Sequence, residues 1–161
     1  MDEVRGKIKT SCNIIFVGLL AVAACMVLGV IYNSGPLLGL GEGYMTFENP
    51  YGWLISIVRP ILHALLFVYT AFMFRTISTN ETPFTENIPR KMKIVALLLF
   101  LSFALPAWMQ DILSSISTGV FGFTFIGNIQ IVALVVSGFV FIMAQIFKYG
   151  FLLQDENYEI L

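Results

Sequence analysis

Four long stretches that carry almost no charge dominate this sequence and restrict what it can fold into. They cover residues 12–32, 53–74, 94–113 and 125–147. Each approaches or exceeds the roughly 20 residues that a helix needs to cross a hydrocarbon layer of about 30 Å. Lipid offers no hydrogen-bond partner to an open strand edge, and no alternating pattern typical of barrel strands is present. The stretches therefore predict an all-α integral membrane protein with four transmembrane helices.

The composition points the same way and excludes other classes of protein. Hydrophobic residues make up 58% of the chain and charged residues 12%, against about 25% charged residues in soluble domains. A chain of 161 residues has too much surface for its volume to hide so many apolar side chains from water. The net charge of -1 creates no field that would attract nucleic acid. We therefore expect one membrane domain over residues 1–161, with the lipid bilayer as its first partner.

The basic residues outside the four stretches orient the chain. Three precede the first stretch, four lie between the second and the third, and Lys148 follows the fourth, whereas the segments 33–52 and 114–124 contain none. Cytoplasmic loops of membrane proteins are enriched in Lys and Arg. The pattern predicts an antiparallel bundle with both termini in the cytoplasm. Trp53 and Trp108 then lie near the outer interface, where indole rings are common.

The first stretch carries small residues at helical spacing, namely Gly18, Ala21, Cys25 and Gly29. Positions three or four residues apart share one side of a helix. Small side chains let another helix approach closely in lipid. We interpret this stripe as a packing face.

The second stretch contains a polar stripe in an otherwise apolar helix. Ser56, Arg59, His63 and Thr70 lie within about 60° of one another at 100° per residue. Arg59 is six positions after Trp53, which corresponds to a depth of about 9 Å. An arginine at this depth costs a few kcal/mol, so it must extend outward, pair with an anion or face water.

The candidate anions for this arginine are Asp111, Glu42 and Glu48. Two interpretations remain open: an outward-facing polar pocket that binds a small molecule, ion or peptide, or a structural ion pair beside a hydrogen-bonded histidine. Intramembrane ionisable residues are functional candidates by default. The candidate site comprises Arg59, His63, Asp111, Gln110, Asn128 and Gln130.

Neither a catalytic set nor a metal site is recognisable in the sequence. The single histidine cannot supply the three or four ligands that zinc requires. The glycine-rich segment 39–43 lacks the lysine and the strand-to-helix setting of a phosphate-binding loop. No spanning stretch contains a carboxylate pair. We expect no enzyme activity and no cofactor.

The predicted cytoplasmic side has two distinctive segments. Before the third stretch, Asn87 is a candidate helix cap, which leaves Pro89 in the first turn. After the fourth stretch, residues 148–161 form an acidic tail that anionic lipid would repel. We expect this tail to dock either on the basic loop or on a partner protein. The candidate contact surface comprises Arg90, Lys91, Lys93, Gln154, Asp155 and Glu156.

These two segments also carry a family resemblance. The loop Thr82-Pro83-Phe84 precedes the third stretch, and the end of the chain has the pattern Phe147, Gly150, Leu153, Gln154 and Glu156. Together they resemble the bacterial membrane-protein family called domain of unknown function 2975. Tyr158 and Ile160 stand where that family has aspartate and threonine. The resemblance implies a bacterial cytoplasmic (inner) membrane protein, often encoded beside a small helix-turn-helix regulator, and implies no established activity.

The leading functional expectation is a non-enzymatic membrane protein that acts through protein contacts. It would be a sensor or regulator, or an immunity-type factor against a membrane-active agent. The alternative is a small transporter or ligand-binding bundle that uses Arg59, His63 and Asp111. A cytoplasmic regulatory protein and a second copy of the chain are the candidate protein partners.

Overall fold

The computed structural model describes residues 2–34, 52–80, 85–124 and 127–159, and these form four helices without a strand. The helices are α1 (Asp2–Ser34), α2 (Gly52–Asn80), α3 (Asn87–Thr118) and α4 (Asn128–Glu159). Each contains a segment that is long and apolar enough to cross a membrane: Gly6–Tyr32, Gly52–Asn80, Asn87–Thr118 and Asn128–Gln154. The prediction of an all-α chain with four such helices is confirmed.

The helices are longer than the stretches that predict them. With 32 residues, α4 is about 48 Å long at 1.5 Å per residue, which exceeds the hydrocarbon thickness of about 30 Å. It continues past Phe147 without a break to Glu159. The segment predicted as a separate tail is therefore, as far as it is described, the last turns of a helix.

The start of α3 differs from the expected cap. Asn87 is the first helical residue, and Glu86 before it has helical dihedrals (φ -50, ψ -35) and no side-chain cap bond. The Ile88 N–H donates instead to the Thr85 carbonyl at 3.1 Å. A capping side chain normally accepts from the second or third helical N–H, and Pro89 removes one of these donors. The cap prediction for Asn87 is wrong, whereas Pro89 does lie in the first turn.

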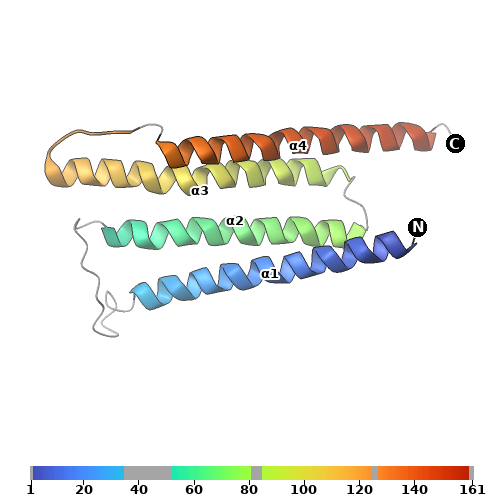
Figure 1. Ribbon diagram of the computed structural model, residues 1–161, viewed down its shortest axis with the longest axis horizontal. Coiled ribbons are helices and arrows are strands. Elements are labelled where there is room, and N and C mark those ends of the chain that lie inside the picture. Colours follow the sequence, from blue (N-terminus) through green and yellow to red (C-terminus); the bar gives the residue numbers. More distant parts are fainter. Residues whose placement is uncertain (1, 35–51, 81–84, 125–126, 160–161) are drawn as a thin grey trace.

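Each helix contacts only the helices next to it along the chain. Contacts join α1 to α2, α2 to α3 and α3 to α4, and no other pair of helices is in contact in the described residues. Figure 1 shows the four helices as a row, with the N and C labels at the same end of the molecule. The four helices therefore form an open row and do not close into the bundle expected from the sequence. In lipid, apolar surface by itself does not drive helices together, so nothing forces the outer helices to meet.

Small and apolar side chains form the contacts between neighbouring helices. Leu66 and Met73 of α2 pack with Ile88 and Val95 of α3 in one buried cluster. Ala71, Ala104 and Ala144 have no exposed surface. The Ser78 hydroxyl of α2 donates to the Asn13 side-chain oxygen of α1 at 2.7 Å.

The small-residue stripe of α1 is not the face that contacts α2. Gly18, Ala21 and Cys25 are exposed, and a Cβ atom added at Gly18 or Gly29 would meet nothing within 4 Å. Within this chain, the packing face expected from the stripe is not used.

Candidate functional site

A cavity of about 420 Å³ brings together all the predicted intramembrane polar residues except Asp111. We call it the polar pocket. Arg59 and His63 come from α2, Gln110 from α3, and Asn128 and Gln130 from the first turn of α4. The rest of the lining comprises Ser102, Phe103, Ala107 and Ile129. The pocket extends over one face of α3, which lies between the other two helices.

Arg59 is an exposed side chain on the wall of this pocket. It forms no ion pair with any residue that the structure describes, whereas Glu42 and Glu48 lie outside the described residues. No ion pair joins Arg59 to Asp111, whose carboxylate accepts the Thr124 N–H at 2.9 Å. Asp111, a residue of α3, therefore holds the connection between α3 and α4 through this bond, and of the three candidate anions it is the one that the structure describes.

His63 is held by the backbone of its own helix. Its Nδ1–H donates to the Arg59 carbonyl at 2.7 Å, because a carbonyl oxygen can only accept. The imidazole also meets the Phe103 ring edge to face, with centroids 5.0 Å apart. The proton on Nδ1 leaves Nε2 as the acceptor of the neutral ring. The structural interpretation combined a hydrogen-bonded histidine with an ion pair of Arg59. The hydrogen-bonded histidine is present, whereas Arg59 and Asp111 form no ion pair.

Gln130 forms a hydrogen bond at the start of α4. It is buried, with 7% of its surface exposed, and its Oε1 accepts the Gly127 N–H at 3.0 Å. A Cβ atom at Gly127 would lie 2.7 Å from that oxygen. The glycine therefore allows the close approach that orients the amide at the pocket.

An apolar groove of about 500 Å³ adjoins the polar pocket. The two cavities share Phe103, Asn128 and Ile129. The groove continues along α3 and α4, where its lining consists of Leu99, Val132, Ala133 and Val136. Sequence reasoning missed this groove because both helices carry apolar residues on every face. No sequence pattern distinguishes the apolar residues that line a cavity from the others.

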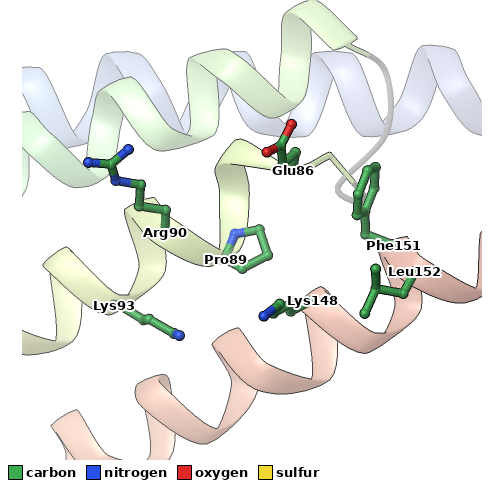
Figure 2. A pocket seen from close by; sticks show the side chains of 7 residues that line it. All are labelled: Glu86, Pro89, Arg90, Lys93, Lys148, Phe151 and Leu152. Atoms are coloured by element: carbon green, nitrogen blue, oxygen red, sulfur yellow. The ribbon is translucent and has the colours of Figure 1, made fainter. Parts of the chain in front are cut away.

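A third cavity, of about 400 Å³, lies between the start of α3 and the end of α4 (Figure 2). We call it the basic groove. Its lining consists of Glu86, Pro89, Arg90 and Lys93 from α3 and Lys148, Phe151 and Leu152 from α4. The three α4 residues were absent from the predicted contact surface. Their spacing of three and four positions would have grouped them on one helix face, had α4 been expected to continue beyond Phe147.

The structure divides the predicted cytoplasmic contact surface. Arg90 and Lys93 line the basic groove, whereas the Lys91 ammonium donates to the Thr76 hydroxyl of α2. Gln154 and Glu156 lie farther along α4. The exposed Glu156 forms no ion pair with these three cations, and the side chain of Asp155 lies outside the described part of the chain. Docking of the tail on the basic loop is not observed for Glu156.

The described residues contain no group of three or more His, Cys, Asp or Glu side chains that could hold a metal ion. No family model, curated protein or solved structure matches this chain. The resemblance to domain of unknown function 2975 therefore stays a prediction, and the functional argument depends on the three cavities.

Proposed function

We propose that this chain is a non-enzymatic, multi-pass protein of a bacterial inner membrane that binds an amphiphilic acid in the polar pocket. The observation that carries the proposal is the position of Arg59. It lines a cavity with hydrogen-bonding side chains and pairs with none of the described carboxylates.

The chemistry of the pocket favours a carboxylate or a phosphate group as the polar part of the ligand. A guanidinium group binds either anion through two parallel hydrogen bonds. Gln110 and Asn128 have amide groups that can donate or accept beside it. An arginine without an anion is costly at membrane depth, so under the proposed threading an anionic ligand would lower the free energy of this site.

The adjoining apolar groove favours a hydrocarbon part in the same ligand. Its exposed walls are almost entirely apolar, and it shares Phe103 and Ile129 with the polar pocket. Ligand sites generally combine apolar walls with a few polar groups that orient the ligand. A fatty acid or a similar lipophilic acid fits this combination.

A photoactivatable fatty acid that carries a diazirine tests the proposal in nanodiscs. We expect the wild-type chain to be labelled in the peptides that contain Phe103 or Ile129, and Arg59→Gln to lose the labelling. Arg75→Gln is the matched control, because Arg75 lies on the same helix, outside the polar pocket and against the Phe16 ring. Equal labelling of Arg59→Gln and wild type would contradict the proposal.

The proposed threading places both termini in the cytoplasm and the helices antiparallel across the membrane. Its support is the distribution of Lys and Arg along the chain. A cysteine at position 120, in a background without Cys12 and Cys25, should react with an impermeant maleimide added to intact cells. A cysteine at position 156 should react only after permeabilisation. The reverse labelling pattern would refute this threading.

A second candidate function is regulation through a cytoplasmic protein partner at the end of α4. Its support is that α4 extends past the start of α3 (Figure 1) and that Glu156 is exposed there. A photocrosslinker placed at Gln154 or Glu156 should capture one defined protein in native membranes. Failure to capture any protein would count against this function.

A further inference from the structure

Two lysines of facing helices converge in the basic groove. Figure 2 shows the ammonium groups of Lys93, from α3, and Lys148, from α4, facing the same space beside Pro89. The guanidinium of Arg90 points away from the two ammonium groups (Figure 2). With Glu86 as the single acidic residue of the lining, the groove has an excess of positive charge.

No described carboxylate neutralises these lysines. Glu86 lines the same cavity but forms no ion pair with any of the three cations in the described part of the chain. Lys93 has one favourable contact, with its Nζ 5.4 Å from the centroid of the Phe141 ring. Like charges that converge next to apolar surface repel each other more than they would in water. An anion between the two ammonium groups would reverse the sign of this interaction.

The depth of the groove indicates the source of the anion. Lys148 directly follows the uncharged stretch 125–147, so under the proposed threading it lies where the hydrocarbon meets the lipid headgroups on the cytoplasmic side. The groove is also lined by apolar side chains, Pro89, Phe151 and Leu152. The Phe141 ring, which contacts Lys93, is 46% exposed and lies on the hydrocarbon side of the groove. A soluble acidic peptide would not reach that ring, whereas an acyl chain would.

We propose that the basic groove binds the headgroup of an acidic phospholipid from the cytoplasmic leaflet. The phosphate lies between Lys93 and Lys148, and an acyl chain lies against Phe141. Basic pockets between transmembrane helices on the cytoplasmic side are suited to such headgroups. The inference depends on the proposed threading and is independent of the ligand in the polar pocket.

Native mass spectrometry of the full chain, released from nanodiscs of equal parts phosphatidylglycerol and phosphatidylcholine, tests the inference. We expect the wild-type chain to retain phosphatidylglycerol. The single variant Lys148→Gln should weaken this retention about fivefold. The double variant, with Lys93→Gln and Lys148→Gln, should weaken it about fivefold for each lysine removed. Lys148→Arg should behave as wild type, because it keeps the charge.

The charge-matched control is Lys7→Gln with Lys9→Gln, which removes two cations from the same predicted side of the membrane, outside the groove. This control should retain the lipid as wild type does. The proposal is overturned if the groove variant keeps its phosphatidylglycerol, if the control loses it equally, or if wild type retains both lipids alike. It is also overturned if soluble glycerol phosphate displaces the lipid fully, because the site would then recognise a free phosphate.

The fatty-acid labelling at Phe103 separates this inference from the proposed function. A folded Lys93→Gln, Lys148→Gln variant should label as wild type does. Loss of lipid retention with intact labelling supports the basic groove alone, and intact retention with lost labelling in Arg59→Gln supports the polar pocket alone.

Discussion

The basic groove lies at the start of α3 and the polar pocket along its second half, and the two differ in how their polar side chains are held. In the polar pocket, His63 and Gln130 are held by hydrogen bonds to backbone groups close in sequence. In the basic groove, Lys93 and Lys148 come from different helices, and Lys93 is held by a single ring contact. Side chains that are positioned before a ligand arrives give directional recognition. Flexible ammonium groups respond mainly to charge. The pocket should therefore discriminate the shape of a ligand, and the groove its charge.

Overpacking α3, the helix that contributes to both sites, should have the largest effect and weaken binding at both. Ala104 has no exposed surface, so Ala104→Leu should cost about 1–3 kcal/mol of folding free energy and weaken binding at both sites. Thermal unfolding in detergent, together with both binding assays, measures this. Leu97→Ala is the control, because Leu97 is 57% exposed on the same helix. Loss of only one of the two activities would show that the sites do not share α3 as their support.

Salt should separate the two sites by several-fold. Between about 0.1 M and about 1 M salt, the Debye length falls from about 10 Å to about 3 Å. Lipid retention at the groove, which is lined by Arg90, Lys93 and Lys148, should fall several-fold. Fatty-acid labelling should fall less, because Arg59 is the one basic residue of the polar pocket and the hydrocarbon part of the ligand lies in the apolar groove. Retention and labelling measured across a salt series test this. An equal salt dependence at both sites would contradict the distinction between shape and charge.

Removal of the His63 hydrogen bond should affect the polar pocket alone. His63→Ala abolishes the bond to the Arg59 carbonyl, which contributes about 1 kcal/mol, and it should weaken fatty-acid labelling about fivefold. His63→Gln, which keeps a donor, should lose less. Retention of phosphatidylglycerol in the groove should stay at the wild-type level, and a decrease there would refute the independence of the two sites.

The smallest effect is expected between α1 and α2, away from both sites. Ser78→Ala removes the hydrogen bond to Asn13, and such bonds in membrane proteins contribute about 0.6 kcal/mol. The unfolding temperature should fall slightly while both binding activities stay the same. Altered binding at either cavity would mean that α1 influences sites that it does not contact.

The positions of the helices follow from local hydropathy, and so do the residues that membrane insertion makes costly. Arg59 and His63 could be selected because each is ionisable within an apolar stretch. The pairing of Arg59 with Asp111 could not be tested by spacing alone, since the Asp111 carboxylate accepts a hydrogen bond from Thr124, which lies beyond the end of α3. The contribution of Lys148 to the basic groove depended on α4 continuing past the apolar stretch.

The sequence by itself determined that the chain has four long apolar helices, with its basic residues on alternate connections. Both properties depend on neighbouring residues and on the solvent around them. Only the tertiary structure decided that the helices form an open row, that Arg59 and Asn128 line one cavity without Asp111, and that Lys93 faces Lys148. In lipid the apolar side chains do not select a neighbouring helix, so close contacts and individual hydrogen bonds decide which helices pack together.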